Sequence, residues 1–367
     1  MQIRANIFTC PGGDTIQMQK TKVALEKIGC NVDLSLELRP NLSDYDVIHL
    51  FNITRVQETF IQVQNAVEQK KPIVLSTIYW PFNDFEKKAN IGIRKILGKF
   101  FDADKMASIK ALAKYLLLRE KDEGTKYLIH HKYSEMQQYI LRNTNIFLPN
   151  ALGEMEQIKK HLKFFADLED IVIVPNAIDL EIAEKALKEK TDKFVKYKGW
   201  LICVGRIDAR KNQLKLLEAI SGSDYKLLLV GKCSPGQKNY YKKVMRCIKD
   251  NPNVEYIEQI SNDDLYQLYK ECRVSVLPSW FETPGLVSLE AAVMGCNIVV
   301  SDKGTTKEYF GSYAFYCDVM DSNSIREQID LAYCTVYDKN FRFKIMTEYT
   351  WEKAALATYR GYKAALQ

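Results

Sequence analysis

The amino-acid sequence predicts an α/β protein made of two doubly wound domains, each with a parallel sheet between helices. A length of 367 residues is enough for two domains that each bury their own core. The composition, 47% hydrophobic and 27% charged, is that of an ordinary globular protein. In both halves, short apolar segments alternate with helical segments, which is a pattern typical of parallel sheets.

The first half predicts an N-terminal domain over residues 1–180. Helices are expected near 15–28, 56–69 and 152–165. Pro72 begins one of the strand-like segments, where its missing N–H group is tolerated. The strand-like segments are 3–9, 32–36, 47–51, 73–77, 146–148 and 171–174.

Residues 84–135 interrupt this alternation and predict a helical insertion. Ile91, Ile96 and Leu97 follow helical spacing, and lysines and arginines lie between them. Within 86–132 there are twelve Lys and Arg against six Asp and Glu, an excess equal to the net charge of +6 of the whole chain. One interpretation is an insertion that packs on its own domain with solvated lysines. The other is an amphipathic surface for anionic lipid, hence peripheral membrane association. Nucleic acid is disfavoured because no recognised binding module surrounds these residues.

The second half predicts a second doubly wound domain over residues 200–347. A charged, lysine-rich linker is expected at 181–199, and a last helix within 348–367. The predicted strands are 200–204, 226–230, 254–257, 274–277, 298–301 and 314–316.

Cysteine, histidine and hydropathy patterns limit the class of protein. Nine cysteines without a Cys-x-x-Cys pair predict reduced thiols, as in a cytoplasmic protein. The four histidines have no metal-ligand spacing, so no metal site is expected. No run of 18 apolar residues predicts a transmembrane helix, and the first residues do not have the cleavage site of a signal peptide. We therefore expect a cytoplasmic protein.

The stretch 278–302 carries two carboxylates on one strand–turn–helix unit. Glu282 lies before a predicted helix, and Glu290 lies inside it, eight positions on. Gly295 ends this helix, because a residue without Cβ fits the left-handed position there. Glu290 is either a helix-surface residue or a carboxylate that binds ligand hydroxyls. The backbone N–H groups at the helix start favour an anion, and they belong to Thr283, Gly285 and Leu286.

Two cations follow the first strand of the second domain. Gly205 ends this strand, and Arg206 and Lys211 come next, before a helix that begins near Gln213. Open α/β sheets bind ligands at the carboxyl ends of their strands. A forked guanidinium and a compact ammonium suit a diphosphate, although such cations are often only solvated. The spacing therefore indicates a diphosphate site.

A glycine pair follows the first strand of the first domain. Gly12 and Gly13 have no Cβ, so their backbone can approach a phosphate closely, although most such pairs are simply turns. The chain has no G-x-G-x-x-G motif and no P-loop lysine. A dinucleotide-dependent dehydrogenase and a P-loop ATPase are therefore disfavoured.

Together these motifs resemble the donor site of the retaining family-4 glycosyltransferases of the GT-B fold, bacterial nucleotide-sugar-dependent enzymes of the group 1 type. The resemblance covers nearly all of the second domain and is weaker in the first. Two further segments carry it: 175–179, with Ala177 in place of the usual Gly, and the loop 301–308. It implies two Rossmann-like domains that face a central cleft, and a last helix that crosses back to the N-terminal domain.

The same resemblance implies an activity and roles for the residues above. A sugar is transferred from a nucleotide diphosphate sugar to a glycan or lipid-linked acceptor with retention of configuration, as in bacterial surface glycan biosynthesis (lipopolysaccharide, capsule or exopolysaccharide). Arg206 and Lys211 hold the diphosphate, Glu282 binds the donor sugar and Glu290 the ribose. The catalytic candidates are Glu282, Arg206 and Lys211, and no metal or other cofactor is expected. The donor-binding set is Gly12, Gly13, Gly205, Arg206, Lys211, Glu282, Thr283, Pro284, Gly285, Leu286 and Glu290.

The first domain departs from the family pattern on the acceptor side. The family often has a histidine after the strand at 72–77, and here none is present. Asp14 and Tyr79 are the acceptor-side candidates instead. Two other functions stay open: a nucleotide-sugar epimerase of the same fold, and a catalytically inactive protein that binds a membrane surface. The complete set of cations and carboxylates argues against the inactive protein.

Overall fold

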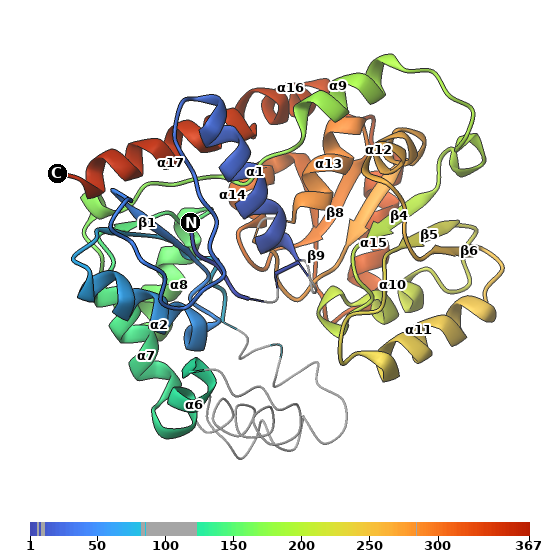
Figure 1. The fold of residues 1–367 in the computed structure, drawn as a ribbon. Helices are drawn as coiled ribbons and strands as arrows, with labels where there is room; N and C mark the ends of the chain where they lie inside the picture. The colour runs from blue at the N-terminus through green and yellow to red at the C-terminus, as the bar shows by residue number, and fades with distance from the viewer. Residues whose placement is uncertain (6, 9–11, 82–84, 86–122, 284) are drawn as a thin grey trace. The chain divides into compact units, whose positions relative to one another are not determined.

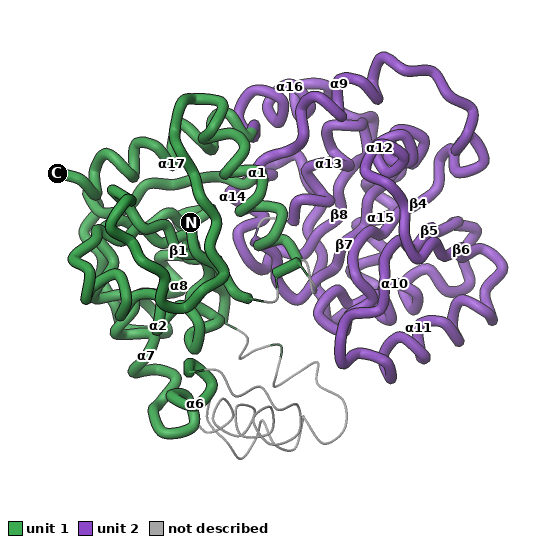
Figure 2. Tube along the Cα trace, in the orientation of Figure 1, with its two compact units in different colours: residues 1–176, 351–367 green, residues 177–350 purple. Residues whose placement is uncertain are grey.

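The computed structural model describes residues 1–5, 7–8, 12–81, 85, 123–283 and 285–367. The chain forms two compact units (Figures 1 and 2). Unit 1 contains residues 1–176 and 351–367, and unit 2 contains residues 177–350. Each unit has its own parallel sheet, which confirms the predicted α/β class. None of the described helices is long and apolar enough to cross a membrane.

Unit 2 holds a six-stranded parallel sheet in the order β6-β5-β4-β7-β8-β9. From β4 the chain continues to β5 on one side, and from β7 it continues to β8 on the other side. The switch point of the sheet, where the strand order reverses, therefore lies between β4 and β7. The strands match the predicted segments closely, because fully buried strands appear in sequence as short apolar runs. They are β4 (Leu201–Val204), β5 (Leu227–Val230), β6 (Val254–Ile257), β7 (Val274–Leu277), β8 (Asn297–Ser301) and β9 (Ala314–Cys317).

Helices cover this sheet in two groups. One group consists of α10, α11 and α15, and the other of α9, α12, α13 and α16. Residues 181–199, which we predicted as a linker, contain most of α9 and lie within unit 2, where α9 packs against α12 and α13. The helices are α9 (Leu180–Lys188), α10 (Gln213–Ala219), α11 (Lys238–Lys249), α12 (Asn262–Glu271), α13 (Leu286–Met294), α14 (Thr306–Phe310), α15 (Ser322–Cys334) and α16 (Lys339–Glu348).

Unit 1 holds a parallel sheet of three strands in the order β1-β2-β3. They are β1 (Ile48–Phe51), β2 (Ile73–Ser76) and β3 (Ile146–Phe147). The predictions of strands at 3–9, 32–36 and 171–174 were wrong for the described residues. Segments 32–36 and 171–174 have only the single bridges of Ser35 and Ile171. The described residues of 3–9 have no bridge, and the chain turns back where the Ile7 N–H donates to the Arg4 carbonyl.

The helices of unit 1 include the last helix of the chain. They are α1 (Gly13–Lys27), α2 (Val56–Glu68), α6 (Glu123–His130), α7 (Tyr133–Arg142), α8 (Leu152–Leu162) and α17 (Trp351–Ala365). Of the predicted insertion at 84–135, residues 86–122 lie outside the described residues. Its described end contains α6 and the first residues of α7.

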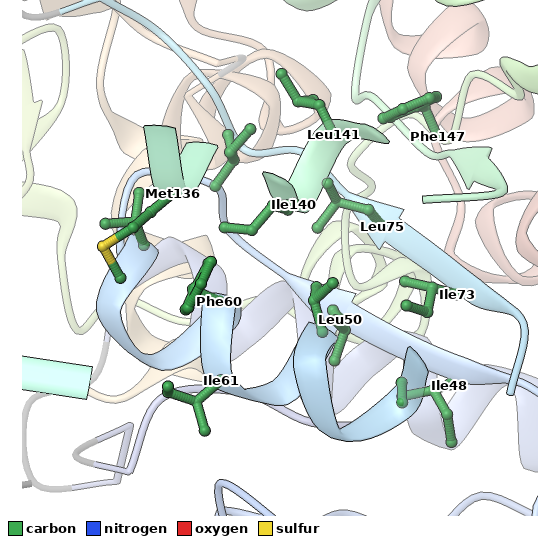
Figure 3. Close-up of a cluster of buried hydrophobic side chains, with 14 of the residues drawn as sticks. Ile48, Leu50, Phe60, Ile61, Ile73, Leu75, Met136, Ile140, Leu141 and Phe147 are labelled. Carbon is green, nitrogen blue, oxygen red and sulfur yellow. The ribbon is translucent and has the colours of Figure 1, made fainter. Parts of the chain in front are cut away.

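The main core of unit 1 lies between the sheet and helices α2 and α7 (Figure 3). Leu50 of β1 and Leu75 of β2 are fully buried there with Phe60 of α2 and Ile140 of α7. Burying each such side chain contributes about 1.5–3 kcal/mol.

Within unit 1, helix α17 is held against the sheet by apolar packing and by a buried histidine. A Cβ on Gly361 would lie 2.7 Å from Leu148 Cδ2, so the helix backbone comes very close to the sheet. His49 of β1 has its Nδ1 2.8 Å from the Tyr362 hydroxyl of α17 and its Nε2 2.9 Å from Ser76 Oγ. Burial, and to a smaller degree the N-terminal ammonium group, holds the pKa of His49 well below its ordinary value.

This histidine makes the stability of unit 1 depend on pH. The folded protein keeps His49 neutral, whereas the unfolded chain takes up a proton below about pH 6.5, so acid favours unfolding. We expect the free energy of unfolding to fall by up to about 1.4 kcal/mol per pH unit below that value. His49→Gln should remove this component, as measured by urea denaturation at pH 7.5 and 5.5. His130→Gln, at an exposed position, is the control; equal pH dependence in His49→Gln and wild type would contradict the assignment.

Candidate donor-binding site

Lys211, one of the two predicted cations, meets the predicted carboxylate Glu282 at the switch point of the sheet in unit 2. The loop after β4 begins at Gly205, and the loop after β7 runs through Ser279 to Glu282. Gly231, after β5, allows the neighbouring loops to approach, because a Cβ there would lie 2.2 Å from the Gly205 carbonyl oxygen. The carboxyl ends of β4 and β7 therefore define one ligand-binding edge.

A short 3₁₀ turn, Ala209–Lys211, directs two cations toward this edge. The Asp208 side chain accepts a hydrogen bond from the Arg210 N–H at 2.9 Å and begins the turn. The turn ends at Asn212, which has a left-handed backbone. The Trp280 N–H donates to the Arg210 carbonyl at 2.9 Å, which ties the loop after β4 to the loop after β7.

Glu282 is a buried carboxylate paired with these cations. Lys211 Nζ lies 2.6 Å from Glu282 Oε1, and Arg210 Nη1 lies 3.5 Å from the same oxygen. Arg210 also donates to the Phe281 carbonyl at 3.1 Å. Burial alone would raise the pKa of Glu282, but the charges of Lys211 and Arg210 outweigh it and leave that pKa below its ordinary value. Burial lowers the pKa of Lys211, and Glu282 offsets this in part.

The loop after β8 supports the backbone of Glu282. Glu282 forms a parallel bridge with Gly304, and its carbonyl accepts a hydrogen bond from the Thr305 N–H at 2.9 Å. A Cβ on Gly304 would lie 1.9 Å from that carbonyl oxygen, so glycine is required. The side-chain oxygens of Thr305 and Ser288 are buried, and within the described residues neither has a hydrogen-bond partner.

Helix α13 has the predicted bounds and the predicted glycines at its ends. Gly285 precedes it and Gly295 follows it, both with positive φ. Glu290 lies half-buried on this helix. The pKa values of Tyr266 and Tyr269 on α12 are raised mainly by the burial of these tyrosines and, to a smaller degree, by the charge of Glu290. Thr283 and Leu286 are half-buried at the helix start, and the predicted donor-site residue Pro284 lies outside the described residues. The ribose-binding role of Glu290 stays a prediction.

Comparison with known proteins identifies this region. Residues 184–334 match the family described as glycosyl transferases group 1. The matched residues all lie within unit 2. O-antigen chain mannosyltransferase B of Escherichia coli is 26% identical over 181 residues, 46% of this chain and 46% of that protein. The matches span less than half of the length of such relatives.

Solved structures show the fold of the whole chain. Sucrose-phosphate synthase of Thermosynechococcus elongatus superposes with a TM-score of 0.67 at 16% identity, over 96% of this chain and 93% of that one. The Anabaena protein HepE, in complex with UDP and glucose, gives a TM-score of 0.57 at 14% identity, over 99% and 95% of the two chains. These likenesses confirm the predicted GT-B fold.

The two cations predicted to hold a diphosphate, Arg206 and Lys211, have different surroundings in the structure. Arg206 is exposed, and within the described residues no hydrogen bond or ion pair is seen for its guanidinium. Arg210, which we did not predict, contacts the carboxylate together with Lys211. Its position directly before Lys211 was the available signal, but only the turn at Ala209–Lys211 shows that both side chains reach the same oxygen.

The predicted residues of unit 1 lie around the start of α1 and the end of β2. Gly12 caps α1, and a Cβ on Gly13 would have no atom within 4 Å, so this position does not require glycine. Asp14 forms a two-pronged ion pair with the buried Arg4, at 2.7 and 3.0 Å. Burial alone would raise the pKa of Asp14, but the hydrogen bonds and the charge of Arg4 keep that pKa below its ordinary value. Tyr79 packs in the core, where burial raises its pKa to about 12. Both acceptor-side roles stay predictions.

A metal site was not expected, and the described residues hold no group of three or more His, Cys, Asp or Glu side chains that could bind one.

The buried pair predicts a specific pattern of stability. Lys211→Met should lower the free energy of unfolding by about 3 kcal/mol, because Glu282 is then left buried without its nearest cation. Adding Glu282→Gln should recover most of this loss, since the amide carries no charge. Urea denaturation measures both. Lys215→Met, which removes a partly exposed pair with Glu218, should cost less than about 1 kcal/mol. A double variant as unstable as Lys211→Met would show that the pair is not the cause.

Proposed function

We propose that this protein transfers a sugar from a nucleotide diphosphate sugar to an acceptor hydroxyl with retention of configuration. The observation that carries the proposal is the buried Glu282 carboxylate, paired with Lys211 and Arg210 at the switch point of a group 1 glycosyltransferase domain. A carboxylate suits the hydroxyls of a sugar, and adjacent cations suit a diphosphate. The E. coli relatives are mannosyltransferases, which supports a mannosyl donor and a role in surface glycan assembly. The HepE structure supports the nucleotide class of donor.

The proposed step breaks one bond and forms one at the anomeric carbon. The bond from this carbon to the diphosphate oxygen breaks, and the diphosphate leaves with the electron pair. The acceptor oxygen attacks from the same face, and its proton passes to the leaving diphosphate. Lys211 and Arg206 stabilise the charge on the leaving group, and Glu282 orients the sugar. Because these cations supply the positive charge, we propose that no divalent metal is needed.

The test begins with nucleotide binding. Calorimetric titration with UDP and GDP should show binding to the wild type by at least one of them. Arg206→Ala should weaken it by about 1.5–3 kcal/mol without loss of stability, because this side chain is exposed and unpaired within the described residues. Arg246→Ala removes an exposed arginine of α11 and should bind as the wild type does. Equal binding in wild type and Arg206→Ala would remove Arg206 from the site.

The reaction itself is tested with a panel of UDP- and GDP-sugars and methyl α-D-mannopyranoside as the acceptor. We expect release of nucleoside diphosphate that survives EDTA, and an α-linked product from an α-linked donor, as seen by NMR. Glu282→Gln should bind the nucleoside diphosphate but lose most turnover. Inverted configuration, or activity that EDTA abolishes and Mg²⁺ restores, would reject the proposed mechanism. Interconversion of the donors without an acceptor would favour the nucleotide-sugar epimerase.

We also propose peripheral association with anionic membranes through 86–132, which suits a lipid-linked acceptor. The observation behind it is the excess of Lys and Arg in this segment. Each cation near such a surface contributes about 1 kcal/mol. Vesicles with anionic lipid should therefore co-sediment the protein at low salt and release it at high salt, and neutral vesicles should not bind it. Binding that ignores lipid charge would leave a soluble acceptor as the better proposal.

A further inference from the structure

A buried glutamate that the sequence analysis did not select lies at the carboxyl edge of the sheet in unit 1. Glu154 is in the first turn of α8, after β3, and its side chain is fully buried. The neighbouring loop, Thr77–Tyr79, follows β2 at the same edge. Parallel sheets bind ligands at this edge, so an ionisable group buried here calls for a physical explanation.

Both carboxyl oxygens of Glu154 accept backbone hydrogen bonds, and they do so from different segments. Oε2 accepts from the Tyr79 N–H at 3.3 Å and from Thr77 Oγ1 at 2.5 Å. Oε1 accepts from the Asn150 N–H at 3.2 Å. The carboxyl group therefore joins the loop after β2 to the start of α8. A glutamine in its place would turn an NH₂ group toward one of the two backbone N–H groups, so the geometry requires a carboxyl.

The loop held in this way contains a strained residue. Ile78 has φ +42°, a left-handed conformation that a β-branched residue rarely adopts. Its neighbours on both sides, Thr77 and Tyr79, are the residues that Glu154 holds. The strained turn sends Ile78 toward the cluster of Ile3, Ile7, Met18 and Phe51, while Tyr79 enters the core beneath α2 and α7. Such strain persists only where the surroundings fix it, and it concentrates at functional sites.

The groups that face Glu154 are neutral. They are Thr77, Tyr79 and Asn150, and the Asn150 side chain in turn accepts a hydrogen bond from Gln17 of α1 at 2.9 Å. Burial raises the pKa of Glu154 to about 7, against the effect of its hydrogen bonds. Unlike Glu282, this carboxyl has no cation among the described residues that offsets its burial. The presence of a buried carboxyl group here is explained by the turn that it holds.

We propose that Glu154 is a positioning residue that holds the strained 77–79 turn, and that this turn forms part of the surface that binds a sugar acceptor. The inference rests on the proposed function. The cations and the carboxylate proposed to hold the donor lie in unit 2, so the equivalent edge of the sheet in unit 1 is available for the second substrate. Ile78 and Trp80 are half-buried at this turn, and their apolar groups suit the C–H face of a sugar ring.

The test compares Glu154→Gln with wild type at saturating donor. We expect the KM for methyl α-D-mannopyranoside to rise about tenfold, as for loss of one hydrogen bond to a carboxyl group. The KM for the donor and the affinity for nucleoside diphosphate should be unchanged, because they depend on unit 2. Glu156→Gln removes an exposed carboxylate two residues away on α8 and should behave as wild type.

A double-mutant cycle separates positioning from general damage. Glycine adopts positive φ without strain, so an Ile78→Gly background no longer needs Glu154 to hold the turn. In that background, Glu154→Gln should change the acceptor KM by less than about twofold. Equal effects of Glu154→Gln in both backgrounds would overturn the proposal, as would an unchanged acceptor KM in the single variant.

Three further outcomes are decisive. If Glu154→Gln does not fold, Thr77→Val removes only the hydroxyl contact and should raise the acceptor KM in the same direction; an unchanged KM would reject the proposal. If the wild type hydrolyses the donor but transfers to no sugar, the turn is not part of a sugar site. If the wild type neither binds nor consumes any nucleotide sugar, the proposed function itself fails.

Discussion

The buried contact between Lys211 and Glu282 is the interaction on which the rest of unit 2 depends. Taking two charges out of water is costly, and the cost is offset only when the two groups are held in good geometry. Here that geometry requires the switch in strand order between β4 and β7, which places the two loops side by side. It also requires Gly304, because any side chain there would displace the backbone of Glu282. The geometry of this ion pair therefore depends on the doubly wound topology of the sheet.

Sequence alone could predict unit 2 well and unit 1 less well, for a physical reason. The strands of unit 2 are buried on both faces, so each is a short apolar run with clear ends, and α13 is bounded by two glycines with positive φ. In unit 1, the apolar residues at 3–9 suggested a strand. In the structure, Ile3 and Ile7 are instead buried in a cluster against Met18, while the chain turns back near Arg4. Apolar character predicted burial there but not the backbone conformation.

The same limit applies to the functional residues. The motif spacing identified Lys211 and Glu282 but not Arg210, since which cation reaches the carboxylate depends on the direction of a 3₁₀ turn. Glu154 was missed because a glutamate in the first turn of a helix ordinarily serves as an exposed cap. Its partners Thr77 and Tyr79 lie 77 and 75 positions away in the sequence. Only the fold shows that they meet.

The two buried glutamates illustrate two ways in which a fold can use a carboxyl group. Glu282 has its pKa lowered by cations, so it stays ionised, and a ligand that draws Lys211 away must replace that charge balance. Glu154 has its pKa raised by burial, and its two oxygens accept hydrogen bonds from the backbone of two different segments. If the proposed function holds, the first group exchanges partners with a charged ligand, whereas the second is suited to hold a backbone turn in place. A carboxylate at the edge of a parallel sheet can therefore be assigned to binding or to positioning by the cations that do or do not surround it.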